Sequence, residues 1–124
     1  MDWDDYPNFS EEEFACSHTG EVKMLPEFMA RLQRLRTAYG KPMVITSGYR
    51  SLKHPLEADK ARPGVHTLGC AADVAVHGQD AYLLVKHALE CGFTGIGVSQ
   101  RPGKPRFIHL DLLQEEPRPN IWSY

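Results

Sequence analysis

Two short stretches of the chain place ionisable side chains inside otherwise apolar runs. GVHTLGCAADVAV carries His66 and, seven residues later, Asp73, while PRFIHLDLL carries His109. Burying an unpaired carboxylate costs several kcal/mol, so a buried Asp73 needs a positive charge beside it. A metal ion held by these three side chains would supply that charge. His66 and Asp73 are not at helical spacing, so they must come from a loop and the strand that follows it.

Two neutral imidazoles and one carboxylate form a typical catalytic zinc set, in which the fourth position is left for water. Such an ion lowers the pKa of its water toward roughly 7 and polarises a carbonyl group. Each residue also has a structural interpretation. A lone histidine usually packs or lies at the surface, Asp73 could pair with Arg50, and His109 with Asp111 could form a surface pair. Since no HExxH motif is present, a metallopeptidase here would belong to another class.

The elements that must position these residues follow from the hydrophobic pattern. Ser10 and Glu13 form a capping box and predict a short helix. LPEFMARLQRLRTAYG has a 3.6-residue apolar period, begins with Pro26 in its first turn and ends at Gly40, so it predicts a long helix. DAYLLVKHALECG predicts a second amphipathic helix with Asp80 as its N-cap. Strands are predicted for MVITS, CAADVAV, TGIGVS and PRFIHLDLL.

The order of these elements predicts an α+β fold, with a small, mostly antiparallel sheet and flanking helices. The 124 residues, 42% apolar and 24% charged, fit one domain spanning 1–124. Residues 52–65 contain two prolines and many charges, and we expect an irregular loop there. The tail QEEPRPNIWSY predicts a proline-broken coil that packs back on the domain through Trp122 and Tyr124.

Charge and composition argue against several classes of partner. The net charge is −2, which leaves no basic surface for nucleic acid. No apolar run approaches the roughly 18 residues that span a bilayer, so no membrane partner is expected. The acidic N-terminus lacks the features of a signal peptide, and we expect synthesis in the cytoplasm without one. Three cysteines without a CxxC pair predict buried apolar residues rather than disulfides or a zinc ribbon. We expect a monomer.

Three motifs together resemble a known family. ITSGYRS (45–51), H-x-x-G-x-A-A-D (66–73) and GFTGIGV…FIHLD (92–111) are similar to motifs of the zinc D-alanyl-D-alanine carboxypeptidases and related peptidoglycan endopeptidases. That group shares its fold with the hedgehog signalling domain. The resemblance covers the chain from about Asn8 to Asp111.

The resemblance implies a zinc metallopeptidase that cleaves bacterial peptidoglycan stem peptides or cross-links at bonds next to D-amino acids. It implies that His66, Asp73 and His109 bind Zn²⁺ and that Arg50 holds substrate. A planar guanidinium suits a terminal carboxylate or a developing oxyanion. The small size and the missing export signal resemble a phage lysis or virion-associated enzyme that reaches the cell wall after release. A bacterial wall-remodelling enzyme is the alternative.

The sequence departs from the family where a proton carrier is needed. Several branches have an acid three residues before the last zinc histidine, and others have a histidine two residues before it. Here these positions are Arg106 and Phe107, and neither accepts a proton. Asp111 is a candidate base, or alternatively an acceptor that orients a histidine ligand. His54 is a second candidate acid or base. The missing acid keeps open a catalytically inactive zinc-binding module of the hedgehog type.

Overall fold

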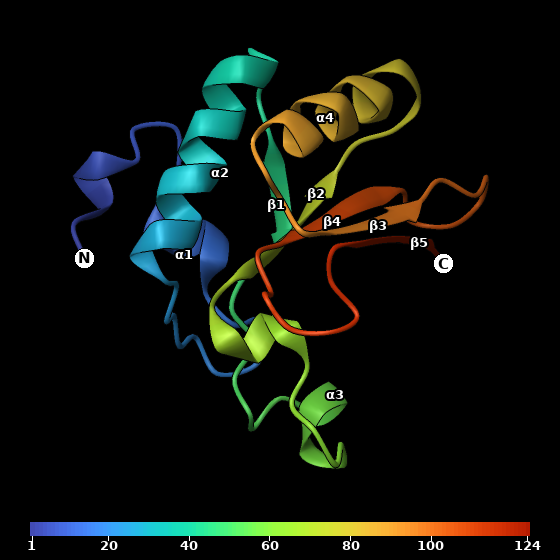
Figure 1. The fold of residues 1–124 in the computed structure, drawn as a ribbon. Coiled ribbons are helices and arrows are strands. Elements are labelled where there is room, and N and C mark those ends of the chain that lie inside the picture. Colours follow the sequence, from blue (N-terminus) through green and yellow to red (C-terminus); the bar gives the residue numbers. More distant parts are fainter.

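A computed structural model describes residues 1–124 as a five-stranded sheet with its two long helices over one side (Figure 1). The strand order is β1-β2-β4-β3-β5, and every neighbouring pair is antiparallel except β3 and β5, which are parallel. The predicted α+β fold with a mostly antiparallel sheet is therefore confirmed. The elements are η1 (Trp3–Asp5), α1 (Glu11–Phe14), α2 (Pro26–Tyr39), β1 (Val44–Ser47), α3 (Pro55–Ala58), η2 (Val65–Leu68), β2 (Ala71–Ala75), α4 (Gly78–Glu90), β3 (Gly95–Ser99), β4 (Phe107–Asp111) and β5 (Asn120–Ser123).

Helix α2 forms where its pattern predicts it. Pro26 occupies the first turn, where its missing N–H costs no hydrogen bond, and Gly40 ends the helix in the left-handed conformation with φ 75°. The apolar stripe packs against the sheet and α4, and the ring of Phe28 meets that of Phe93 edge-on at 6.0 Å. The buried members of the stripe are Phe28, Met29, Leu32, Leu35 and Tyr39. Neither α2 nor any other helix has the length and apolar character needed to cross a membrane.

The central strands β2 and β4 separate the core from the opposite face of the sheet. They pair antiparallel with Asp73 opposite His109 and with Val74 opposite Ile108. Val74 and Ile108 are each only 1% exposed and belong to the core. Because side chains alternate along a strand, Asp73 and His109 must then point to the other face. The register alone therefore places both predicted ligands side by side.

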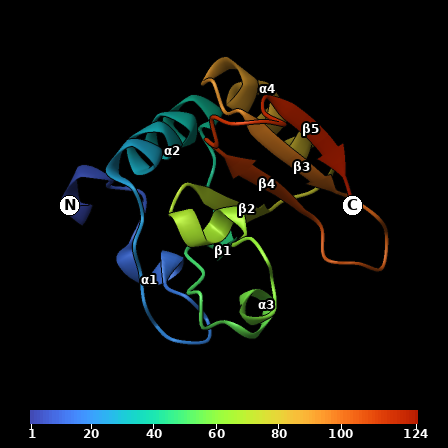
Figure 2. The same cartoon turned by 60° about the horizontal axis from the view of Figure 1, so that its bottom comes forward.

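The C-terminal tail is the predicted coil only as far as Pro119. Residues Asn120–Ser123 form β5, which lies parallel to β3 at the edge of the sheet (Figure 2). The N–H of Asn120 donates to the Thr94 carbonyl, and that of Tyr124 donates to Val98. The proline-broken pattern ends before this strand begins, so every residue of β5 keeps the N–H that pairing requires.

Two further boundaries differ from the sequence prediction. Helix α4 begins at Gly78 with His77 as its N-cap, three residues before the predicted cap Asp80. The Gln100 side chain accepts a hydrogen bond from the Gly78 N–H at 3.1 Å, a tertiary cap that the local sequence does not reveal. The segment 52–65, predicted as irregular, contains the single turn of α3.

Candidate metal centre

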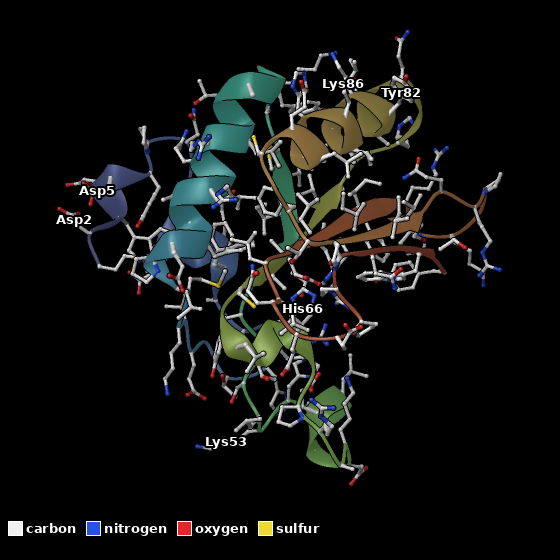
Figure 3. All side chains as sticks on the ribbon, in the orientation of Figure 1. Asp2, Asp5, Lys53, His66, Tyr82 and Lys86 are labelled. Atoms are coloured by element: carbon white, nitrogen blue, oxygen red, sulfur yellow. The ribbon has the colours of Figure 1, made fainter.

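The structure brings the three predicted ligands together on the face of the sheet opposite α4. His66 comes from η2, Asp73 from β2 and His109 from β4, and one ligand atom of each lies within 4.8 Å of the others. Oδ1 of Asp73 lies 2.9 Å from Nδ1 of His109 and 3.5 Å from Nε2 of His66. Figure 3 shows His66 on the side of the sheet away from α4. Two nitrogens and one carboxylate oxygen thus converge on one point.

A tight backbone turn delivers His66. Gly69 ends η2 with φ 75°, and a Cβ there would run into the Lys23 carbonyl, so only glycine fits. Nδ1 of His66 lies 2.8 Å from the Gly48 carbonyl oxygen. Since a carbonyl only accepts, Nδ1 carries the proton and Nε2 keeps its lone pair for a metal. His66 is therefore fixed in the tautomer that presents Nε2.

His109 presents the other ring nitrogen toward the ligand atoms. Its Nε2 lies 2.7 Å from Oδ2 of Asp111, and its Nδ1 faces Asp73. Burial lowers the pKa of His109, but the hydrogen bonds to Asp111 and Asp73 outweigh it and raise that pKa above its usual value. With the Nε2 proton donated to Asp111, the Nδ1 lone pair is the one available to a metal. The two histidines therefore use different ring nitrogens.

The two acids of the centre differ in how their charge is balanced. Burial raises the pKa of each, but hydrogen bonds from histidine, and at Asp111 also from Arg118, lower both to about 2. Both are therefore ionised at neutral pH. Arg118 neutralises Asp111 through two hydrogen bonds, at 3.1 and 2.8 Å. Asp73 has only imidazoles beside it, so the residual negative charge lies where the ligand atoms meet, which suits a divalent cation.

Arg50 lies at the rim of this centre and is held by an acid that the sequence did not reveal. A cavity of about 390 Å³ opens over the ligands and is also lined by Arg50 and Lys60. Glu57, whose side chain is fully buried, pairs with Arg50 at 3.1 Å and with Lys60 at 3.0 Å. It also accepts the N–H of Gly64 at 2.8 Å. No sequence pattern distinguishes Glu57 from its neighbours in a charged loop.

His54 lies apart from the three ligands. It is the N-cap of α3, and its Nδ1 accepts the Leu56 N–H at 3.1 Å. It lines a second small hollow, whose only shared residue with the ligand cavity is Arg50. Its nearest ring is that of His18, with centroids 5.7 Å apart.

Aromatic side chains form the remaining wall of the ligand cavity. Phe107, two residues before His109, packs against Tyr124 with ring centroids 5.2 Å apart and ring planes tilted by 51°. Trp122 also lines the cavity, and Asp73 is the only carboxylate that does so. Asp111 has no exposed surface and is absent from the lining. The tail thus contributes cavity residues that the sequence analysis assigned only to packing.

Fold and site together describe an open α+β sheet that carries a two-histidine, one-aspartate group able to hold a metal ion. The sequence model of the family described as Peptidase M15 matches residues 7–111. The chain therefore belongs to the Peptidase M15 family, a zinc-dependent family of metallopeptidases, and the predicted resemblance is confirmed. A search among curated proteins finds no significant match.

Proposed function

We propose that this protein is a zinc peptidase that hydrolyses bonds next to D-amino acids in the stem peptides or cross-links of bacterial peptidoglycan, in wall lysis or remodelling. The observation that carries the proposal is the convergence of His66 Nε2, Asp73 Oδ1 and His109 Nδ1, with each histidine held through its second nitrogen by an oxygen. The family match supports the peptidase class, and the motif resemblance supports the peptidoglycan substrate.

The donor set fits zinc. Neutral imidazole nitrogens and a carboxylate are ligands that zinc accepts at a site with an open fourth position. Each histidine hydrogen bonds through its other nitrogen to an oxygen, as metal-ligating histidines almost always do. When bound, zinc would lower the pKa of a water and polarise the scissile carbonyl.

Arg50 is proposed to hold the substrate. One of its five N–H donors is used on Glu57, and the others remain for a carboxylate or carbonyl oxygen of the peptide. Its backbone N–H donates to the His66 carbonyl at 3.2 Å, which ties the arginine to the segment that carries this ligand. Lys60 adds a second positive charge on the same side of the cavity. This pair favours a substrate with an anionic end, as a carboxypeptidase would require.

Asp111 is proposed to orient His109 rather than to carry the proton. Its carboxylate has no exposed surface and is already shared by His109, Arg118 and the Leu113 N–H. A base must reach the attacking water within about 3 Å or through one further water. His54, outside the ligand cavity, is a weaker candidate still.

A zinc-binding module without turnover is the second candidate function. The observation that favours it is that Asp73 is the only carboxylate lining the cavity, so no separate acid faces the site. This alternative makes the same metal prediction and differs only in catalysis.

Purified protein incubated with muropeptides, with products identified by mass spectrometry, separates the two candidates. We expect cleavage next to a D-amino acid, one zinc per chain, and loss of both on His66→Ala. His87→Ala is the matched control, because His87 lies on α4 and pairs only with Glu90. Stoichiometric zinc without any product would favour the binding module. A wild-type protein that binds no zinc would refute both.

A further inference from the structure

The tail that follows β4 makes the contacts that hold the His109 side of the metal centre. It lies beyond residues 7–111, the part that the family model matches. Arg118 nevertheless donates from Nε to Oδ1 of Asp111 at 3.1 Å and from Nη2 to Oδ2 at 2.8 Å. Both side chains are shielded from water, with exposures of 11% and 0%. A two-pronged contact of this kind fixes the orientation of the carboxylate as well as its charge.

Trp122 contacts both His109 and Arg118. Its ring centroid lies 5.3 Å from that of His109, and the Arg118 guanidinium carbon lies 4.6 Å from the Trp122 ring. His109, Asp111, Arg118 and Trp122 therefore form a closed ring of contacts. The place of the indole depends on Gly97, because a Cβ there would lie 2.8 Å from Trp122 Nε1.

This ring holds the His109 imidazole with its Nδ1 toward Asp73, the nitrogen that a bound metal would use. Oδ2 of Asp111 receives both His109 Nε2 and Arg118, so the position of the carboxylate oxygen sets the tilt of the imidazole. The indole packs against the imidazole face and restricts rotation of the ring. Without the guanidinium, the buried carboxylate would lose its only full positive charge and its fixed orientation.

We infer that Arg118 and Trp122 are positioning residues of the metal centre, and that zinc binding is coupled to docking of β5 through them. The inference rests on the metal-binding half of the proposed function and requires no turnover. Coupling between two equilibria is reciprocal, so zinc must strengthen the docking of β5 by the factor by which docking strengthens zinc binding. The backbone hydrogen bonds from Asn120 to Thr94, just before β3, and from Tyr124 to Val98 in β3 report that docking.

Arg118→Met tests the inference, because it keeps most of the aliphatic stem and removes the guanidinium. Arg62→Met is the matched control. Arg62 reaches Glu115 of the same tail at 3.6 Å, but both side chains are largely exposed, at 87% and 64%. Zinc affinity is measured by competition with a chromophoric chelator. We expect Arg118→Met to weaken zinc binding about 10- to 100-fold, the range found for partners of metal-bound histidines. Arg62→Met should stay within about twofold.

Two readouts separate positioning from a general loss of stability. Long-range ¹H–¹⁵N spectra of the zinc-loaded protein should show His109 protonated at Nε2 alone in the wild type and a changed tautomer signal in Arg118→Met. Hydrogen exchange of the Asn120 and Tyr124 amides should slow on adding zinc in the wild type, and much less in the variant. Arg118→Lys keeps the charge without the fork, so its zinc affinity should lie between those of the other two proteins.

An unchanged zinc affinity and tautomer in folded Arg118→Met would overturn the inference and leave the proposed function standing. If Arg118→Met does not fold, Arg118→Lys takes its place in the test. A zinc affinity of Arg118→Lys equal to that of the wild type would then overturn the inference. Zinc that binds the wild type without slowing exchange in β5 would also overturn it. Wild-type protein that binds no zinc would instead refute the proposed function, on which the inference depends.

Discussion

Replacing Glu57 by glutamine should destabilise the protein and weaken catalysis together, because one buried carboxylate holds both the loop and Arg50. Burial raises the pKa of Glu57, but the Gly64 N–H, Lys60 and Arg50 outweigh it and lower it from 4.5 to about 2. Each pKa unit corresponds to about 1.4 kcal/mol, so the ionised Glu57 carboxylate contributes about 3 kcal/mol to the free energy of unfolding at neutral pH. Glutamine can still accept the Gly64 N–H but offers no charge to either cation. We expect a loss of about 2–3 kcal/mol.

The pH dependence of that loss follows from the sign of the shift. A depressed folded-state pKa gives stability that is complete above the unfolded pKa, here near 4.5, and that disappears as the pH falls toward 2. At pH 3.5 the unfolded carboxyl is mostly protonated while the folded one is not. The difference in free energy of unfolding between the wild type and Glu57→Gln should therefore shrink by about 1 kcal/mol between pH 7 and pH 3.5.

Urea unfolding of the metal-free proteins, followed by tryptophan fluorescence at both pH values, measures the difference. Asp80→Asn is the matched control: Asp80 pairs with Lys41 at 2.7 Å, but both side chains are about half exposed. It should cost less than about 1 kcal/mol. With muropeptide as substrate, Glu57→Gln should also lower kcat/KM, whereas Asp80→Asn should not. A Glu57→Gln loss below about 0.5 kcal/mol, or one that is the same at both pH values, would refute the reasoning.

Three further predictions concern the ligand site. Gly95→Ala should destabilise the protein by about 1–3 kcal/mol and weaken zinc binding, because the new methyl group would run into the Asp111 carboxylate. Thermal unfolding and chelator competition measure the two effects, and wild-type values in both would contradict the prediction. Zinc affinity should fall by up to about tenfold per pH unit below the raised pKa of His109, because the proton and the ion compete for Nδ1. Zinc titrations from pH 8 to 5.5 measure this, and an affinity that does not change with pH would contradict the ligand assignment. Arg50→Lys should leave the zinc stoichiometry unchanged and lower kcat/KM at least about tenfold, because lysine lacks the planar guanidinium group that can donate two parallel hydrogen bonds. Activity equal to that of the wild type would exclude a bidentate contact between Arg50 and the substrate.

The residue spacing alone left the ligand set open, and the motif resemblance selected it, but the placement of Asp73 and His109 has a local signal. Asp73 and His109 each stand out as charged residues in apolar strands, and their alternation places them on the face away from the core. Helix α2 was predictable for the same reason, since its stripe, Pro26 and Gly40 all lie within fifteen residues. These features depend on chain geometry that the neighbouring residues determine.

The support around the ligands was not predictable, because its contacts form only when loops fold back on the sheet, and no periodic pattern in the sequence marks them. Glu57 looks like any acid in a charged loop until the fold buries it against Arg50. Arg118 follows a proline in a segment whose composition predicts coil, and only pairing with β3 places it against Asp111. The start of α4 differs for a similar reason, since Gln100 from beyond β3 caps it. Tertiary hydrogen bonds override local propensity in all three cases.

The opposition of Asp73 and His109 across β2 and β4 has a consequence for how the chain folds. The two strands lie far apart in sequence, so their pairing closes a long loop and cannot be specified by a tight turn. A slip of one residue would move every side chain of one strand to the other face and separate the two ligands. An ion that requires both would bind only the correctly aligned sheet. Zinc would therefore act as a selector of strand register, favouring the native alignment over slipped alternatives during folding.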